Sequence, residues 1–139
     1  MVAQIIDGKR IAGEIKAKDV VPSLSAIQAG DDPGTGVYVR AQQKSCEKIG
    51  IEYSLHQFKE DISQKELANF ITRLNKNKRV SGIILQMPLP SHLNSRALQQ
   101  MINPEKDAEG VFPANMGMLI YGRPILGPCT AMAVMKHKK

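Results

Sequence analysis

The sequence predicts an α/β fold in three layers, with a central parallel sheet built from βαβ units. Segments with a strand pattern alternate with segments with a helix pattern along most of the chain. One stretch, residues 80–90 (VSGIILQMPLP), is almost continuously apolar, which is typical of a strand buried on both faces of its sheet. The order strand–helix–strand–helix–strand implies parallel strands joined by right-handed crossovers.

The first half of the chain supplies two of the expected strands and the helix between them. Residues 11–21 (IAGEIKAKDVV) are a short helix candidate, and residues 23–30 (SLSAIQAG) form a partly apolar run that predicts a strand. After a loop of turn-forming residues, a helix is expected over 35–49, closed by Gly50 at the position that favours glycine. Residues 51–58 (IEYSLHQF) alternate between apolar and polar, as a strand does.

The clearest helix start in the sequence is at Ser63. Ser63 and Glu66 have the spacing of a capping box, and Ile62 and Leu67 are placed as its hydrophobic staple. Apolar residues then follow at helical spacing and predict one core-facing stripe, made by Leu67, Phe70, Ile71 and Leu74. The strand at 80–90 comes next, then a helix near 93–102, the polar turn NPEKDAEG and a glycine-rich, irregular end.

Three segments that lie far apart in the sequence are expected to converge at one edge of this sheet. In open parallel sheets, ligands bind outside the carboxyl ends of the strands. The loop GDDPGTG with the start of the helix that follows it, and the QMPLP end of the third strand, belong to that edge. The turn EKDAEG is a third candidate.

The end of the third strand has two readings that the pattern leaves open. Gln86 lies there, and Pro88 and Pro90 lack the N–H groups that a longer ladder needs. A plain strand terminus explains this, and so does a rigid shelf whose glutamine amide both donates and accepts hydrogen bonds with a planar heterocycle.

The acidic turn and the helix at 35–49 also have two readings each. Glu105, Asp107 and Glu109 fit a solvated turn, the commoner case for charged loop residues, or a carboxylate that binds ring N–H groups. Tyr38 and Gln42 lie one helical turn apart, about 5–6 Å between Cβ atoms. They fit a solvated helix face, or a helix that directs polar side chains into a cleft.

Composition limits the classes of function. The 139 residues suffice for one domain with a sizeable core, and at 42% apolar the chain is neither disordered nor membrane-like. The net charge of +6 would suit nucleic acid, but three Tyr, three Phe and no Trp leave few platforms for stacking bases. A basic surface serves an anionic small molecule equally well. No glycine-rich dinucleotide motif or phosphate loop is present.

The sequence shows no metal set or nucleophile triad. The three histidines, His56, His92 and His137, are scattered, and Cys46 and Cys129 lack the spacing of a metal or redox motif. The N-terminus lacks the pattern of a secretory signal, so a reduced, cytoplasmic chain is expected. The GDDPGTG loop precedes a helix and could hold an anion, although its two aspartates argue against phosphate.

Six segments, taken in order, resemble one family. They are IIDGKRIAGEI, AGDDPGTGVYV, KSCEKIGI, GIILQMPLP, NPEKDAEGVFPANMGML and GPCT. Together they resemble the catalytic N-terminal domain of the methylene-tetrahydrofolate dehydrogenase/cyclohydrolase family of FolD type, over nearly the whole chain. The Gln-x-Pro-Leu-Pro and Pro-x-Lys-Asp-x-acid-Gly elements are specific in combination.

The resemblance implies a folate site in a cleft between this domain and a C-terminal Rossmann domain that carries NADP. It implies that Tyr38 packs on the folate, that Gln86 hydrogen-bonds near the reacting centre and that Pro88 lies on the cleft wall. Glu109 stands where the family has a pterin-binding aspartate. The family also implies a possible homodimer. Few aromatic platforms argue against a nucleic-acid partner, and no run reaches the ~18 apolar residues that a membrane span needs, so no membrane partner is expected.

The chain departs from the family pattern at several points. The family's central catalytic lysine is replaced by Gln42, and Lys44 points about 200° around the helix from it, which makes it a poor substitute. Glu109 is one methylene longer than the family aspartate, and Ala131 replaces a proline. The first helix and linker are shorter, and the sequence ends soon after GPCT, where the family continues into its NADP-binding domain.

These departures predict altered chemistry. A glutamine keeps hydrogen bonds but cannot titrate, and general acid–base help is worth about 10²–10⁴-fold. We therefore expect a strongly impaired cyclohydrolase step, and no dehydrogenase turnover by residues 1–139 alone. The leading interpretation is the folate-binding catalytic domain of such an enzyme. A non-catalytic folate-binding or regulatory homologue is the alternative, and a nucleic-acid-binding module is disfavoured.

Overall fold

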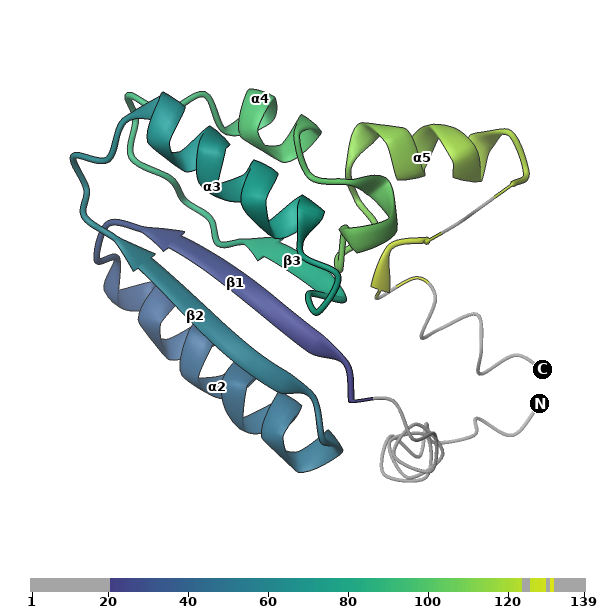
Figure 1. Ribbon diagram of the computed structural model, residues 1–139, viewed down its shortest axis with the longest axis horizontal. Coiled ribbons are helices and arrows are strands. Elements are labelled where there is room, and N and C mark those ends of the chain that lie inside the picture. Colours follow the sequence, from purple (N-terminus) through teal and green to yellow (C-terminus); the bar gives the residue numbers. More distant parts are fainter. Residues whose placement is uncertain (1–20, 124–125, 130, 132–139) are drawn as a thin grey trace, which may run out of the picture.

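The computed structural model describes residues 21–123, 126–129 and 131, and these form the predicted three-layer α/β structure (Figure 1). The sheet of this part of the chain has three strands, all parallel, in the order β2–β1–β3. The strands are β1 (Ser23–Ala29), β2 (Glu52–Phe58) and β3 (Gly82–Leu85).

Helices cover both faces of this sheet. Helix α2 (Pro33–Ile49) lies on one face, and α3 (Gln64–Lys76) with α4 (Ser95–Gln100) lies on the other (Figure 1). The short 3₁₀ helix η1 (Pro104–Lys106) and α5 (Pro113–Ile120) follow beyond the β3 edge. None of the helices in the described ranges is both long enough and apolar enough to cross a membrane.

Helix α2 begins and ends with local signals that the sequence contains. The side chain of Asp32 accepts a hydrogen bond from the Thr35 backbone N–H, and Pro33 occupies the first turn, where its missing N–H costs nothing. The helix therefore starts two residues before the predicted boundary. Gly50 ends it with φ of 78°, the left-handed conformation that glycine adopts without strain, as predicted.

Helix α3 confirms the predicted capping box. The Ser63 hydroxyl accepts from the Glu66 N–H at 3.2 Å, and the Glu66 carboxylate accepts from the Ser63 N–H at 3.1 Å. Leu67, Ile71 and Leu74 are buried, as the helical spacing predicts. Ile62 joins them in the same core cluster, and Phe70 is partly buried against it.

The two faces of the sheet differ in character. Alternate residues of a strand point to opposite faces, and Ile27, Ile83 and Leu85 belong to one apolar cluster with side chains of α3 and α4. The α2 face carries Ala26, Gln28, Ile84, Tyr53 and Gln86, which lie outside that cluster. The main core therefore lies between the sheet and α3.

Two sequence predictions about the second half of the chain were wrong. The third strand is not 80–90 but only Gly82–Leu85, although all four of its residues are buried as predicted. The Gln86 N–H still donates to the Ile27 carbonyl at 2.8 Å, and the chain then turns at Pro88. The helix near 93–102 is the shorter α4.

The irregular C-terminal end expected from the glycines instead contains α5. The helix begins at Pro113 without a side-chain cap, and Gly117 interrupts its apolar pattern, so the usual start signals are absent. Its last turn is exposed, with Ile120 and Tyr121 more than four-fifths accessible. Except for Val21, the helix candidate 11–21 lies outside the described residues.

Candidate functional site

A cavity of about 390 Å³ opens where the strands end and α2 begins. The three segments expected to converge there all contribute to its wall. The lining residues are Asp32, Gly34, Thr35, Tyr38, Ile84, Leu85, Gln86, Met87, Pro88 and Glu109. The parallel topology produces this meeting, because β1 and β3 are neighbours and their carboxyl ends share one edge.

The start of α2 is closed by its own aspartate. Asp32 Oδ2 accepts from the Thr35 N–H at 2.7 Å and from the Thr35 hydroxyl at 2.9 Å, and these bonds lower the pKa of Asp32. The Thr35 hydroxyl also lies 3.3 Å from the Met87 carbonyl oxygen, which ties α2 to the loop after β3. A carboxylate thus occupies the N-terminal position that an external phosphate would need.

Three side chains from three elements form a hydrogen-bonded relay on the α2 face of the sheet. Gln42 Oε1 accepts from the Gln86 Nε2–H group at 2.9 Å and from the Tyr53 hydroxyl at 2.9 Å. Gln86 is only 5% exposed and lines the cavity, whereas Gln42 is half-buried behind it. Position 42 therefore contacts the cavity lining through Gln86.

Burial makes the Tyr53 hydroxyl harder to ionise. It raises the pKa of Tyr53 to about 12, with smaller increases from Cys46 and Tyr38. At neutral pH the phenol is a hydrogen-bond donor, and this suits its contact with the Gln42 oxygen.

Tyr38 forms an open wall of the cavity. It is 59% exposed, so its ring is available to a ligand rather than committed to the core. Pro88 lines the same cavity from the loop after β3. An exposed aromatic ring and a proline-containing loop on the wall of one cavity suit a flat, partly apolar ligand.

The two acidic residues of the KDAEG segment have different environments. Asp107 is 1% exposed, and its carboxylate accepts four hydrogen bonds, from the N–H groups of residues 109, 110 and 112 and from Asn115 Nδ2. Glu109 is half-buried on the cavity wall, where burial, followed by the charge of Asp107, raises its pKa. Asp107 therefore organises the turn, and Glu109 is the carboxylate that a ligand can reach.

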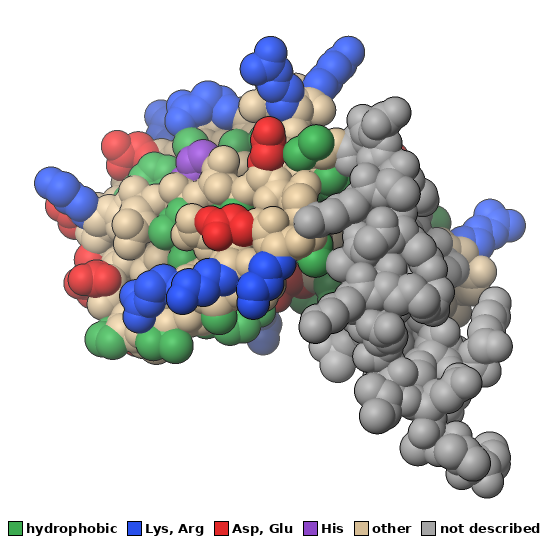
Figure 2. All heavy atoms as spheres, turned by 90° about the horizontal axis from the view of Figure 1, so that it is seen from below, with side chains coloured by type: hydrophobic (Ala, Val, Ile, Leu, Met, Phe, Trp, Pro, Cys, Tyr) green, Lys and Arg blue, Asp and Glu red, His purple; other side chains and the backbone are tan. Residues whose placement is uncertain are grey.

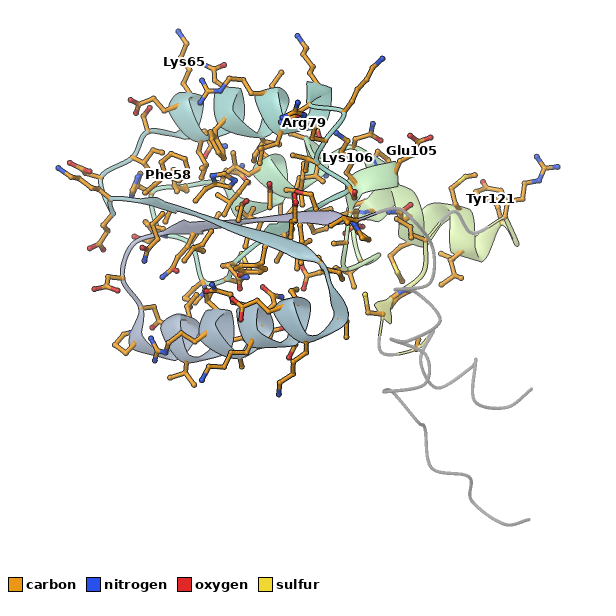
Figure 3. All side chains as sticks on the ribbon, turned by 60° about the horizontal axis from the view of Figure 1, so that its bottom comes forward. Phe58, Lys65, Arg79, Glu105, Lys106 and Tyr121 are labelled. Atoms are coloured by element: carbon orange, nitrogen blue, oxygen red, sulfur yellow. The ribbon has the colours of Figure 1, made fainter. Side chains whose placement is uncertain are left out.

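The remaining charged residues of this segment are structural or solvated. The Lys106 ammonium group donates to the carbonyls of Leu74 at 3.0 Å and Asn77 at 2.8 Å, which caps the C-terminus of α3. Glu105 is exposed and points away from the body of the protein (Figure 3).

A family model described as "Tetrahydrofolate dehydrogenase/cyclohydrolase, catalytic domain" matches residues 2–109. The chain belongs to this family. "Bifunctional protein FolD" of a Nitratiruptor species is 37% identical over 145 residues, which cover 96% of this chain and 51% of that protein. The protein of the same name from Prochlorococcus marinus is 43% identical over 144 residues, covering 95% of this chain and 48% of its own.

Solved structures of the tetrahydrofolate dehydrogenase/cyclohydrolase family show the same fold. The bifunctional FolD enzyme from Campylobacter jejuni has a TM-score of 0.81 and 35% identity, and the match covers 94% of this chain and 51% of that one. The Trypanosoma brucei FolD, complexed with NADP cofactor and inhibitor, has a TM-score of 0.78 and 33% identity over 96% of this chain and 50% of that one. The chain thus spans about half the length of the curated relatives it matches.

The structure brings together the residues that the family resemblance singled out. Tyr38, Gln86, Pro88 and Glu109 line one cavity, and Gln42 contacts it through Gln86. Lys44 does not join them. It is exposed on the outer side of α2, where Figure 2 shows basic side chains in a row.

Sequence reasoning missed Tyr53, Asp107 as the buried anchor, and Thr35. Tyr53 sits in an alternating strand, where a tyrosine is an ordinary residue, so no local signal marks its contact with position 42. Among the described residues, no group of three or more His, Cys, Asp or Glu side chains is placed to hold a metal ion. The two cysteines, Cys46 and Cys129, are free thiols.

Proposed function

We propose that residues 1–139 are the folate-binding catalytic domain of a methylenetetrahydrofolate dehydrogenase/cyclohydrolase. The whole enzyme would oxidise 5,10-methylenetetrahydrofolate and hydrolyse 5,10-methenyltetrahydrofolate to 10-formyltetrahydrofolate. The observation that carries this proposal is the cavity itself. It combines an exposed aromatic ring, an oriented amide and a half-buried carboxylate, from Tyr38, Gln86 and Glu109.

Each of these groups has a distinct part in binding. The Tyr38 ring packs on one face of the folate, with Pro88 on the wall beside it. The Glu109 carboxylate accepts hydrogen bonds from ring N–H groups, and its partial burial strengthens such bonds when it is ionised. Gln86 hydrogen-bonds near the reacting carbon, held in place by Gln42.

We propose that NADP, which the family implies as hydride acceptor, is not bound at the β1–α2 turn of this chain. The β1–α2 turn is the position where a dinucleotide fold holds its diphosphate, and here the Asp32 carboxylate occupies the helix N-terminus. We therefore derive no hydride step from these residues. Isolated residues 1–139 are expected to show no NADP reduction with 5,10-methylenetetrahydrofolate.

The cyclohydrolase step is proposed to be impaired, because the amide of Gln42 cannot take up or release a proton. We expect Gln42→Lys to raise the rate of 5,10-methenyltetrahydrofolate hydrolysis by about 10²–10⁴-fold over the unmodified chain. The absorbance loss of the methenyl compound measures this rate. Gln43→Lys is the matched control, because it adds the same charge on the exposed side of α2. Equal rates in all three chains would contradict this role for position 42.

Folate binding without turnover is the second candidate function. The observation that favours it is the engagement of Gln42 Oε1 by two donors, which makes position 42 a structural acceptor. Calorimetry with tetrahydrofolate decides whether the chain binds folate at all, and the Gln42→Lys rate decides between the two candidates. Homodimer formation and a cytoplasmic location stay predictions.

A further inference from the structure

Resting on the proposed folate site, we propose that Tyr53 is a positioning residue that sets which end of the Gln86 amide faces the cavity. The Tyr53 hydroxyl acts through Gln42, and the outcome is that Gln86 presents its carbonyl oxygen to the ligand. The cavity therefore offers an acceptor at this position, which suits a ligand N–H group.

Two hydrogen-bond donors meet at one oxygen atom on α2. Gln42 Oε1 accepts from both the Tyr53 hydroxyl and Gln86 Nε2, each at 2.9 Å. The nitrogen end of the Gln86 amide is therefore turned toward α2. No donor in the described ranges bonds Gln86 Oε1, and Gln86 lines the cavity, so its oxygen is the end left for a ligand.

The side-chain amides of Gln42 and Gln86 could also adopt a second, reversed arrangement. If both amides were reversed, Gln42 Nε2 would donate to Gln86 Oε1 and to the Tyr53 oxygen. The phenol would then meet an N–H donor at the 2.9 Å contact where it now meets an acceptor, and its proton would have to leave Gln42. The observed contact, in which the phenol donates to the Gln42 oxygen, therefore favours the first arrangement.

The residue at position 42 consequently determines the polarity of Gln86. A lysine at this position only donates, so it would draw the Gln86 oxygen toward α2 and leave the Nε2–H group facing the cavity. A glutamate only accepts, so it would keep the present orientation. Phenylalanine at position 53 would remove the donor that distinguishes the two arrangements.

The first test needs no ligand. The side-chain ¹⁵N–¹H signals of Gln86, assigned by their loss in Gln86→Ala, are recorded in the 139-residue chain and its variants. We expect Tyr53→Phe and Gln42→Lys to weaken the hydrogen bond from Gln86 Nε2 and shift its signals upfield, and Gln42→Glu, a charged acceptor, to keep that bond and shift them in the opposite direction. Tyr121→Phe is the matched control, because it removes a phenol hydroxyl from an 84% exposed ring (Figure 3). Unchanged Gln86 signals in Tyr53→Phe would overturn the proposal.

The second test measures tetrahydrofolate affinity by calorimetry in a double-mutant cycle. We expect Tyr53→Phe to weaken binding by about 3- to 10-fold, the usual value of one hydrogen bond. In the Gln42→Ala background the same change should have less than a twofold effect, because its route to the ligand is gone. Equal losses in both backgrounds would show that Tyr53 acts independently of Gln42, and would overturn the relay.

The two tests separate this proposal from the proposed function. If the unmodified chain fails to bind tetrahydrofolate, the proposed folate site is contradicted. The Gln86 signals recorded without ligand still decide whether Tyr53 orients Gln86. If tetrahydrofolate binds and Tyr53→Phe leaves the Gln86 signals unchanged, the folate site is supported and the role of Tyr53 is contradicted.

Discussion

The two faces of the central sheet differ in the side chains that they carry. The face toward α3 and α4 is packed with apolar side chains in one cluster, including Ile27, Ile83 and Leu85. The face toward α2 holds a hydrogen-bonded relay of Gln42, Tyr53 and Gln86, and it leads into the cavity. Both faces belong to the same short strands, so the alternation of side chains places the main apolar core on one side and cavity-lining side chains on the other.

The difference is sharpest within β3, where neighbouring residues belong to opposite faces. Ile83 is fully buried in the apolar cluster, while Ile84 is 8% exposed and lines the cavity. Removing buried methylene groups costs transfer free energy plus the cost of the space left behind. That second cost is smaller beside an existing cavity, because the neighbouring atoms already have unfilled space.

The largest expected effect is a loss of stability that differs between Ile83 and Ile84. Ile83→Ala is expected to lower the free energy of unfolding by about 4–5 kcal/mol, and Ile84→Ala by about 2–3 kcal/mol, within the range for isoleucine truncation. Tetrahydrofolate affinity should show the reverse order, with the greater loss in Ile84→Ala. Urea unfolding and calorimetry on the same two variants measure both quantities. Equal losses of stability would mean that the two faces are not distinct.

The edge of the sheet provides the next prediction. Asp107→Asn replaces one acceptor oxygen with an amide that opposes the donors around it, so we expect a loss of about 1–3 kcal/mol in unfolding free energy. Thermal or urea unfolding measures the loss. Asp61→Asn, at an exposed position, is the control and should change stability by less than about 0.5 kcal/mol. Similar stability in both variants would show that the buried carboxylate is not the anchor of its turn.

A third prediction concerns the pH dependence of the α2 face. Because folding raises the pKa of Tyr53 from 10.0 to about 12, the folded state holds the phenol proton more tightly than the unfolded chain. Its contribution to stability is complete below pH 10 and is lost as pH rises toward 12. Unfolding free energy should therefore fall less steeply over this window in Tyr53→Phe than in the unmodified chain. Parallel curves would place Tyr53 in an environment like that of the unfolded chain.

The smallest expected effect is at Glu109. Its pKa is raised by burial and by Asp107, so ionising it opposes folding, and its contribution to stability is present in acid and lost as pH rises through the raised pKa. Glu109→Gln resembles the protonated form and should gain stability relative to the unmodified chain between pH 4 and pH 7. Glu105→Gln, at an exposed carboxyl, should not. Urea midpoints at the two pH values measure this gain, and a constant difference would contradict it.

Much of the fold could be predicted from local patterns because those patterns report backbone chemistry directly. The capping box at Ser63, the glycine at position 50 and the apolar run of β3 each correspond to a hydrogen bond, a positive φ or burial on two faces. Helix α5 could not, because it starts without a side-chain cap and carries Gly117 in its middle. Its formation follows from packing beside the turn, where Asn115 donates to the Asp107 carboxylate.

The site was only partly predictable, and for a similar reason. The parallel topology was enough to place the ends of β1 and β3 together, and the family resemblance identified Tyr38, Gln86 and Glu109. Spacing could not tell which acid of the KDAEG turn is buried, since Asp107 and Glu109 differ by the donors that surround them. Likewise, the contact between Tyr53 and Gln42 exists only after α2 has packed on β2.

The placement of the relay outside the main core has an evolutionary consequence. Substitutions at positions 42 and 53 alter amides and a phenol that lie on the α2 face, so they leave the apolar cluster under α3 intact. A lineage can therefore pass through several residue pairs at these positions without losing a folded protein on the way. The hydrogen-bonding properties of the cavity can therefore change while the packing between the sheet and α3 stays the same.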